Sequence, residues 1–368
     1  MRPETKRFAA LIAAGAIALA ACSSSGATPA PSAGIPTAPP ASLVISPAAS
    51  VAASATGLKA VYISTGPIGD NPFLQLIAAG LTQAGKDCGV ATSVVESKDT
   101  TQMADNFRAA IDEKTDLIVA NSFDSIDAIT KLGKQFPAQK WALVDSGVAD
   151  NPNVRGLVFQ EHEGTYLIGA IFGLLATGNY PPFPKSDAIS AVGAIDQPFI
   201  RRWLVGFQEG VKAVNPNVKL LDGFGNSFND PATSKELALA QFNKGAKYIF
   251  SFAAAGNTGI FEAAKEKNFY TSGVDTDQRG IDPDHILESM VKRTDLGVYD
   301  SVCDLAKGKF SGGFKAYGLK ERGVGPAFIA LDNINPPSRL PQAVQDKVKA
   351  IAADIASGKI KVTDFLAP

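Results

Sequence analysis

The sequence has few of the side chains that hold metals or build disulfide scaffolds: its 368 residues include three cysteines and two histidines. So few cysteines exclude a disulfide-dense scaffold, and two histidines leave little material for a metal site. An excess of positive charge is also missing, because 35 Lys and Arg oppose 36 Asp and Glu. A nucleic-acid-binding domain usually carries such an excess, and a spanning helix needs about 20 apolar residues, which no run provides. We therefore expect that this chain binds neither a metal nor nucleic acid and is not itself a permease.

The first 22 residues are typical of an export signal. Three positively charged side chains among the first seven residues precede an apolar stretch, residues 9–21. The stretch runs into Leu-Ala-Ala-Cys at residues 19–22, which resembles the lipobox of bacterial lipoproteins. That resemblance implies cleavage before Cys22 and acylation of its thiol, and several acyl chains would anchor the protein on the extracytoplasmic face of the cell membrane. The alternative is an ordinary secretory signal with an incidental cysteine.

Residues 23–57 contain no charged side chain and are rich in Ala, Ser, Pro, Thr and Gly. The segment has no periodic apolar face to bury, so we expect it to be disordered. As a flexible coil it would reach about 30 Å on average. We interpret it as a tether between the signal and a globular body that begins at Leu58.

From Leu58 onward, strand-like apolar runs alternate with helical patterns. The candidate strands are Leu58–Ser64, Val90–Val95, Leu117–Asn121, Trp141–Asp145, Gly156–Gln160, Ala188–Ile195, Val218–Gly223, Tyr248–Phe252 and Tyr270–Asp275. Apolar strands without alternation, separated by amphipathic helices, indicate parallel sheets covered on both faces. Right-handed crossovers then give a doubly wound, Rossmann-like α/β layout.

The length of the body favours two such domains. We expect lobe 1 to comprise residues 58–160 and 277–325. Lobe 2 and a hinge return would comprise residues 161–276 and 326–368.

In doubly wound sheets, ligands bind at the carboxyl ends of the strands, and polar side chains gather there in this sequence. Ser64 and Thr65 follow the first candidate strand, Asp145 ends the fourth, and Asp275 ends the last. Such residues are also common helix caps, so capping and ligand contact both stay open for each of them.

Six segments, in order, resemble the basic membrane protein family of solute-binding lipoproteins, the purine nucleoside receptors of ABC importers. The matching segments are Asp70–Phe73 (DNPF), Glu163–Gly169 (EGTYLIG), Ser227–Ala232 (SFNDPA), Gly256–Gly259 (GNTG), Gly273–Gln278 (GVDTDQ) and Lys292. The resemblance implies a type I periplasmic binding protein, with two α/β lobes joined by a hinge of several crossings. It also implies a two-part permease and ATPase subunits as partners.

The resemblance further implies how a ligand is held. Phe73 and Phe228 match two aromatic rings that sandwich the base, and offset stacking contributes roughly 0.5–1.5 kcal/mol per ring pair beyond area burial. Asp275 and Lys292 match the ribose contacts, and carboxylates accept strong hydrogen bonds from a diol. The alternative for either phenylalanine is simple packing in a lobe core.

Two other positions match less decisively. Gly256 leaves backbone accessible to a ligand because it lacks a Cβ. Glu163 matches an acid that faces the cleft, although it could equally complement the helix dipole. Together with Asp70 and Asp230, the acids outnumber Lys292, so a phosphate would be repelled and we expect a neutral or cationic solute.

One departure from the family leaves the base preference open. Relatives that read purines carry Asp followed by Gly or Asn after the first strand, where this sequence has Ser64 and Thr65. A hydroxyl that donates or accepts thus replaces a carboxylate acceptor. A sugar-binding receptor of the same two-lobed architecture is the alternative function.

Catalysis has little support. A histidine beside acids could act as a general base, but only His162 and His285 are available, without a nucleophile elbow or an activated cysteine pattern. Gly256–Gly259 lacks the Gly-Lys-[Ser/Thr] ending of a P-loop, and Gly66 and Gly69 do not make a dinucleotide-binding turn. We expect a binding protein with no catalytic residue and no cofactor.

Cys88 and Cys303 could pair after export. A disulfide requires their Cα atoms to lie within about 7 Å, which the sequence does not reveal. Their pairing therefore stays open.

Overall fold

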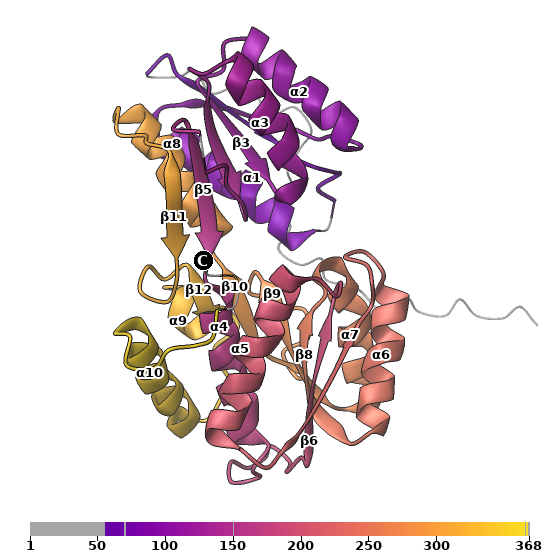
Figure 1. The fold of residues 1–368 in the computed structure, drawn as a ribbon. Coiled ribbons are helices and arrows are strands. Elements are labelled where there is room, and N and C mark those ends of the chain that lie inside the picture. Colours follow the sequence, from indigo (N-terminus) through magenta and orange to yellow (C-terminus); the bar gives the residue numbers. More distant parts are fainter. Residues whose placement is uncertain (1–55, 70, 150, 365, 367–368) are drawn as a thin grey trace, which may run out of the picture. The chain divides into compact units, whose positions relative to one another are not determined.

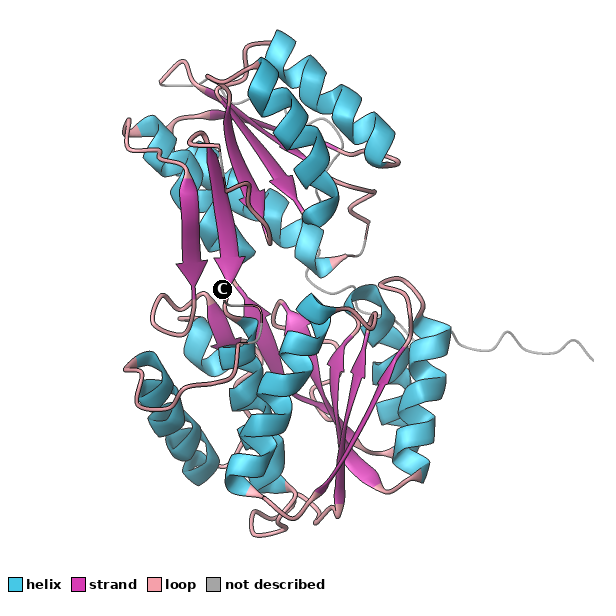
Figure 2. Cartoon of the chain, viewed as in Figure 1, coloured by secondary structure: helices cyan, strands magenta, loops and turns pink. Residues whose placement is uncertain are grey.

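The computed structural model describes residues 56–69, 71–149, 151–364 and 366. Cys22, the expected signal and almost all of the expected linker lie outside these residues, as does Asp70. The described chain forms two six-stranded sheets flanked by helices (Figures 1 and 2). The predicted α/β fold with two lobes is confirmed.

The first sheet has the strand order β11-β5-β4-β3-β1-β2, with every neighbouring pair parallel. We call this sheet and its helices the first lobe. Its strands are β1 (Lys59–Ile63), β2 (Ala91–Val95), β3 (Leu117–Asn121), β4 (Lys140–Val144), β5 (Val154–Phe159) and β11 (Gly313–Tyr317). Its helices are α1 (Pro72–Cys88), α2 (Thr100–Asp112), α3 (Ile126–Gln135) and α8 (Thr294–Ala306), with a 3₁₀ turn η1 (Phe123–Ser125).

The second sheet has the order β12-β10-β9-β8-β6-β7 and is parallel except for β12, which pairs antiparallel to β10. This sheet and its helices form the second lobe. Its strands are β6 (Ala188–Gly193), β7 (Lys219–Phe224), β8 (Ala246–Phe252), β9 (Tyr270–Asp275), β10 (Ile286–Lys292) and β12 (Val324–Pro326). Its helices are α4 (Glu161–Leu175), α5 (Pro198–Val214), α6 (Pro231–Asn243), α7 (Asn257–Lys267), α9 (Ala327–Ala330) and α10 (Gln342–Ala356), with a 3₁₀ turn η2 (Ala254–Gly256).

Central strands such as β3 and β6 are buried along their whole length because helices cover both faces of each sheet. In the first lobe, α1 and α8 pack in one core cluster and α2 and α3 in another. In the second lobe, α4 and α5 belong to one cluster and α6 and α7 to another. This double cover explains why β3 and β6 lack the alternation of half-buried strands.

Helix α1 begins at a well-formed cap. The Asn71 side chain accepts hydrogen bonds from the backbone N–H groups of Phe73 and Leu74, and Pro72 occupies the first helical position. The helix ends at Gly89, whose left-handed backbone (φ 66°) closes the last turn. The cap places Phe73 in the first turn, at the carboxyl end of the sheet.

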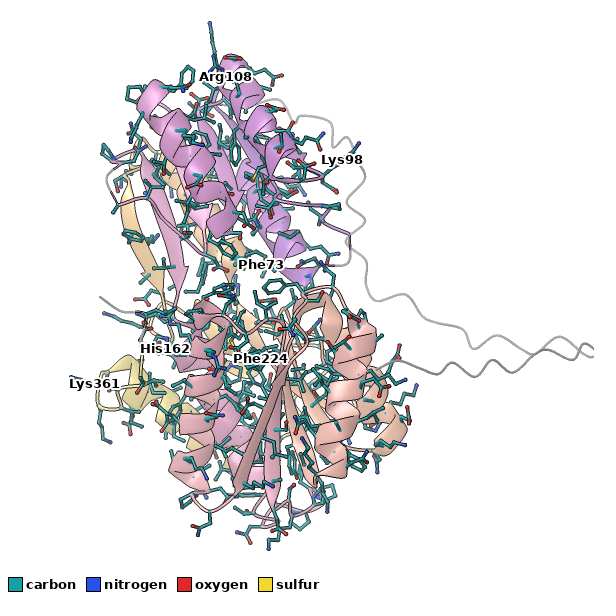
Figure 3. All side chains as sticks on the ribbon, turned by 45° about the vertical axis from the view of Figure 1, so that its right-hand side comes forward. Phe73, Lys98, Arg108, His162, Phe224 and Lys361 are labelled. Carbon is teal, nitrogen blue, oxygen red and sulfur yellow. A yellow bond between two sulfur atoms is a disulfide. The ribbon has the colours of Figure 1, made fainter. Side chains whose placement is uncertain are left out.

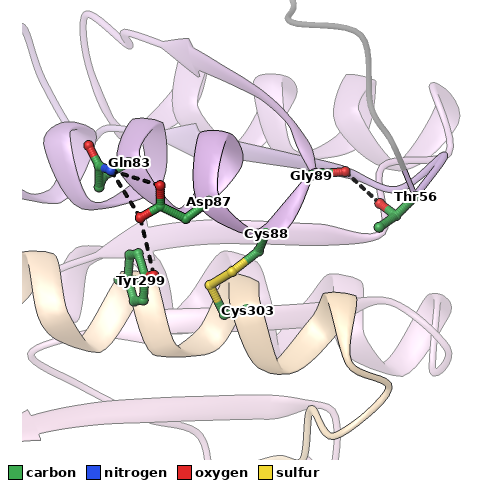
Figure 4. Close-up of a disulfide and its surroundings, with 7 residues drawn as sticks. All are labelled: Thr56, Gln83, Asp87, Cys88, Gly89, Tyr299 and Cys303. Carbon is green, nitrogen blue, oxygen red and sulfur yellow. Dashed lines mark hydrogen bonds between the residues drawn. A yellow bond between two sulfur atoms is a disulfide. The ribbon is translucent and has the colours of Figure 1, made fainter.

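A disulfide joins α1 to α8. Cys88 and Cys303 are bonded, with Cα atoms 5.4 Å apart and a sequence separation of 215 residues (Figure 4). Beside the disulfide, the hydroxyl of Tyr299, one turn before Cys303 on α8, donates to the carboxylate of Asp87 on α1 at 3.2 Å. The pairing that the sequence left open is therefore made, and it fixes α8, which returns from the second lobe, to α1.

Within the described residues, the chain passes between the two sheets three times: from β5 to α4, from β10 to α8, and from β11 to β12. The expected boundaries assigned residues 277–325 to lobe 1, and for β10 this was wrong, because β10 pairs with β9 in the second sheet. This strand is not among the nine candidate strands because Glu288 interrupts its apolar run, and only the family match at Lys292 marks its end. That carboxylate is buried and accepts hydrogen bonds from the Ser289 and Ala327 N–H groups.

Candidate functional site

Four charged side chains from different parts of the chain meet at the carboxyl ends of the strands. Lys292 ends β10, Asp275 ends β9, Asp145 directly follows β4, and Glu161 begins α4. The Lys292 ammonium lies 2.6 Å from Asp145 Oδ2 and 2.8 Å from Glu161 Oε1. We call these four residues the Lys292 cluster. The ion pair between Lys292 of the second lobe and Asp145 of the first lobe joins the two lobes.

Backbone conformation sets two of the carboxylates apart. Asp145 and Asp275 both have left-handed backbones, with φ of 62° and 66°. Residues other than glycine rarely adopt this region, and when they do they are concentrated at functional sites. The shared conformation, at the ends of strands in both lobes, supports a functional reading of this pair over simple capping.

Three aromatic rings surround the ammonium of Lys292. Its Nζ lies 5.3 Å from the ring centroid of Phe73, 5.4 Å from that of Phe159 and 5.5 Å from that of Trp203. All three distances fall within the range of cation–π attraction. Figure 3 labels Phe73 at the first turn of α1. The sequence singled out Phe73 but not the other two rings.

Electrostatics keep Lys292 charged although it is buried. Burial disfavours the ammonium, but the neighbouring carboxylates Asp145, Glu161 and Asp275 raise the pKa of Lys292 above its ordinary value. Two of the three ammonium protons point at Asp145 and Glu161. One donor therefore remains for a third acceptor.

Asp275 is the member of the cluster whose carboxylate is free to bind. Among the described residues, none donates a hydrogen bond to this carboxylate, and the residue is 7% exposed. Burial raises the pKa of Asp275 to about 7, with Lys292 opposing and Asp145 and Glu161 adding to the rise. A buried carboxylate without a donor indicates a place where a ligand supplies one.

Arg202 fixes the position of Glu161. Its guanidinium donates to Glu161 Oε2 at 2.8 Å, to the Phe159 carbonyl at 2.7 Å and to Asp364 Oδ2 at 2.6 Å. Asp364 belongs to the segment after α10, so the end of the described chain is tied to the start of α4. Neither Glu161 nor Arg202 was among the predicted ligand-binding residues, although Glu161 follows the fifth candidate strand and stands two residues before the matched segment at Glu163.

The residues after β1 form a separate polar group. Ser64 is fully buried and its hydroxyl donates to the Gly66 carbonyl at 2.5 Å. Thr65 Oγ1 accepts from the Asn121 side-chain amide at 3.1 Å, and Asn121 in turn accepts from the Tyr62 hydroxyl at 2.9 Å. The Thr65 hydroxyl thus keeps its own proton for donation, whereas the Ser64 proton is used within its turn.

Phe228 lies in the loop between β7 and α6, and its ring packs partly against two core clusters. Its backbone carbonyl accepts from the Gly256 N–H at 3.3 Å. A Cβ on Gly256 would lie 2.6 Å from Ser234 Oγ, so a larger residue here would require the Ser234 side chain to shift. Asp230 caps α6 by accepting from the Thr233 N–H at 3.0 Å. Within the described chain, the rings of Phe73 and Phe228 do not contact each other.

Glu163 lies at the hinge and its carboxylate is engaged there. Oε2 accepts from the Leu319 N–H at 2.8 Å, in the crossing from β11 to β12. Burial raises the pKa of Glu163, and the bond to Leu319 opposes this rise. The structure thus ties this acid to the third crossing, and its contact with a ligand stays a prediction.

A cavity of about 330 Å³ adjoins Asp275. Val291 and Arg293 line it, whereas Lys292 between them does not, as expected for neighbours on opposite faces of a strand. Its other lining residues are Leu76, Thr276, Asp277, Asp295, Leu331, Asp332 and Asn333. Asp275 therefore lies between the other members of the Lys292 cluster and this cavity.

Comparisons with known proteins agree with this architecture. A family model described as "ABC transporter substrate-binding protein PnrA-like" matches residues 58–364. The CD4+ T-cell-stimulating antigen of Listeria monocytogenes is 30% identical over 327 residues, covering 83% of this chain and 87% of the relative. The ABC transporter nucleoside-binding protein BmpA of Lactococcus lactis is 28% identical over 330 residues, covering 83% and 89%.

A solved structure shows the same fold. The ABC transporter solute-binding protein from Aeropyrum pernix K1 superimposes with a TM-score of 0.71 at 24% identity, covering 83% of this chain and 92% of the other. In the described part of this chain, no helix combines the length and apolar character needed to span a membrane.

Proposed function

Because the chain belongs to the PnrA-like family of ABC transporter substrate-binding proteins, we propose that it captures a nucleoside or a related nucleobase compound between its two lobes. Substrate-binding proteins of this kind deliver small solutes to a permease driven by ATPase subunits. The observation that carries the nucleoside proposal is the buried, unpaired Asp275 carboxylate beside the remaining donor of Lys292.

The polar pair suits a ribose. A vicinal diol has two hydroxyls that donate to a carboxylate and can accept from an ammonium. Asp275 would receive the diol protons, and the third N–H of Lys292 would reach a ribose oxygen. Charge-assisted hydrogen bonds of this kind are about twice as strong as neutral ones, so this pair would dominate recognition of the sugar.

The aromatic side chains suit a base. Phe73 from the first lobe and Phe228 from the second would enclose the flat ring, each stacking contact contributing roughly 0.5–1.5 kcal/mol beyond area burial. The Thr65 hydroxyl, whose oxygen is held by Asn121, would donate to a base acceptor. A ligand that contacts both lobes makes more contacts in the closed arrangement than in the open one, and it therefore favours closure.

Charge in the site favours an uncharged solute. Asp145, Glu161 and Asp275 oppose the one ammonium of Lys292 within the cluster. A phosphate would add negative charge to this group at low local dielectric. We therefore infer that nucleosides bind and that their monophosphates do not.

We also propose that the protein is held on the extracytoplasmic face of the cell membrane by a lipid on Cys22. The Leu-Ala-Ala-Cys tetrapeptide after the apolar stretch supports this, and the uncharged segment after it supports a tether. Mass spectrometry of the mature amino terminus should find an acylated cysteine. A chain that is cleaved elsewhere and released in soluble form would exclude the anchor.

A thermal-shift panel on the full-length protein tests the ligand. It should contain purine and pyrimidine nucleosides, their free bases and monophosphates, pentoses and hexoses. A ligand at 100 times its Kd stabilises the folded protein by about 2.7 kcal/mol, which such an assay resolves. We expect nucleosides to shift the transition; a shift by sugars alone would instead favour the sugar receptor.

A further inference from the structure

The turn after β3 presents an aromatic side chain to solvent from a constrained backbone. Phe123 is 52% exposed, which makes it one of the few large apolar side chains exposed in the described chain. Ser122 before it has φ 70° and ψ 157°, a region that costs a residue other than glycine on the order of 1–3 kcal/mol. The buried Ser125 hydroxyl secures the turn by donating to the Asn121 carbonyl at 2.7 Å. The turn is thus built firmly around an exposed ring.

The ring of Phe123 meets a ring of the other lobe. Its centroid lies 5.4 Å from that of Phe199, and the planes are inclined at 51°. Phe199 is the second residue of α5 and packs partly against the core of the second lobe. The distance falls within the range of favourable aromatic pairs. Neither ring is among those placed against the Lys292 ammonium, so this contact is separate from the proposed binding group.

We propose that Phe123 and Phe199 form an aromatic latch that stabilises the closed arrangement of the lobes and thereby sets solute affinity without contacting the solute. Separation of the lobes would break the pair and expose both rings to water. Since the apparent affinity depends on how far closure is populated, losing the pair should weaken every ligand by the same factor. The affinity part of this inference rests on the proposed function; the contact between the rings does not.

The first test needs no ligand. 4-Fluorophenylalanine at position 123 of the full-length protein reports the environment of the ring by ¹⁹F NMR. We expect its resonance to move when Phe199 is replaced in Phe199→Leu or Phe199→Ala, and to stay unchanged in Phe314→Ala. Phe314 is a matched control because it is also exposed, at 60%, and lies on β11 of the same lobe as Phe123. An unchanged resonance in both Phe199 variants would overturn the latch.

The second test measures affinity by calorimetry for each nucleoside that the thermal panel identifies. Phe123→Ala and Phe199→Ala should each raise Kd about 2- to 10-fold, and the double variant should be no weaker than the more affected single variant. Equal factors for all bases support the latch, whereas factors that depend on the base show direct solute contact and overturn it. If no nucleoside binds, the proposed function fails while the fluorine measurement still decides whether the rings meet.

Discussion

The titration of Asp275 offers a sharp test of the proposed site. Burial raises the pKa of this carboxyl to about 7, so its charge changes within the range where the protein can be handled. A nucleoside diol would donate both hydrogen bonds to the ionised carboxylate, whereas the protonated acid loses one acceptor. The binding-competent form is therefore the ionised one.

The expected size follows from the pKa. With a value of about 7, the ionised fraction falls from roughly ten elevenths at pH 8 to roughly one eleventh at pH 6, so Kd should rise about tenfold over this range. Folding responds in the opposite direction. Because the folded state holds the Asp275 proton more tightly than the unfolded state, the stability that it contributes is present in acid and is lost as pH rises through about 7. Affinity must therefore be measured directly and not inferred from melting.

Isothermal titration calorimetry at pH 6, 7 and 8 provides that measurement. The variant Asp275→Asn should bind more weakly and lose the pH dependence. Glu288→Gln is a matched control, because burial also raises the pKa of Glu288 to about 7 but its carboxylate holds backbone N–H groups beside β12. It should keep the tenfold dependence. The reasoning is refuted if Asp275→Asn shows the same pH profile as the natural protein.

Three further predictions address the ring, the ammonium and the disulfide. Phe228→Ala should weaken nucleoside binding at least tenfold by calorimetry while the circular dichroism of the free protein stays unchanged; unaltered affinity would remove Phe228 from the site. Lys292→Met should abolish binding and lower the free energy of unfolding by about 3–5 kcal/mol in urea, because it removes the cation shared by Asp145, Glu161 and Asp275 and leaves, among the described residues, only Glu161 with another cationic partner, Arg202; a variant as stable as the natural protein would contradict this. Cys88→Ser with Cys303→Ser should cost up to about 5 kcal/mol of unfolding free energy, since the bond closes a loop of 215 residues, and an unchanged midpoint would show that the bond does not constrain the unfolded chain.

Much of the fold follows from the sequence because its central strands are apolar runs that need no distant information. Leu117–Asn121 and Tyr270–Asp275 were both predicted with the bounds that the structure gives them. The strands that escaped carry polar or exposed residues: Glu288 in β10 is stabilised by backbone donors, and Phe314 in β11 lies on an edge strand. Local pattern does not reveal the Ala327 donor to Glu288, because it lies 39 residues farther along the chain.

The same limit explains which residues of the site could be predicted from the sequence. Asp145, Asp275 and Lys292 could be singled out because they lie at strand ends or match a family segment, and the structure brings all three together. Trp203 and Arg202 stand inside a helix whose pattern is that of an ordinary amphipathic segment, so nothing local marks them as neighbours of Lys292. Their role appears only when α5 is placed against the start of α4.

In the described chain, each of the three crossings between the lobes holds or contacts a charged side chain. The first enters α4 at Glu161, the second leaves β10 at Lys292, and the third is held to α4 by the bond from the Leu319 N–H to Glu163. Glu161 and Lys292 form an ion pair. A solute that binds the Lys292 ammonium would therefore contact a pair of residues that belong to two of the crossings. Relative movement of the lobes must in turn change the distance from Lys292 to Asp145, which lies on the other side of the hinge. Solute binding and lobe closure would therefore be coupled through the same ammonium, with no longer chain of contacts required.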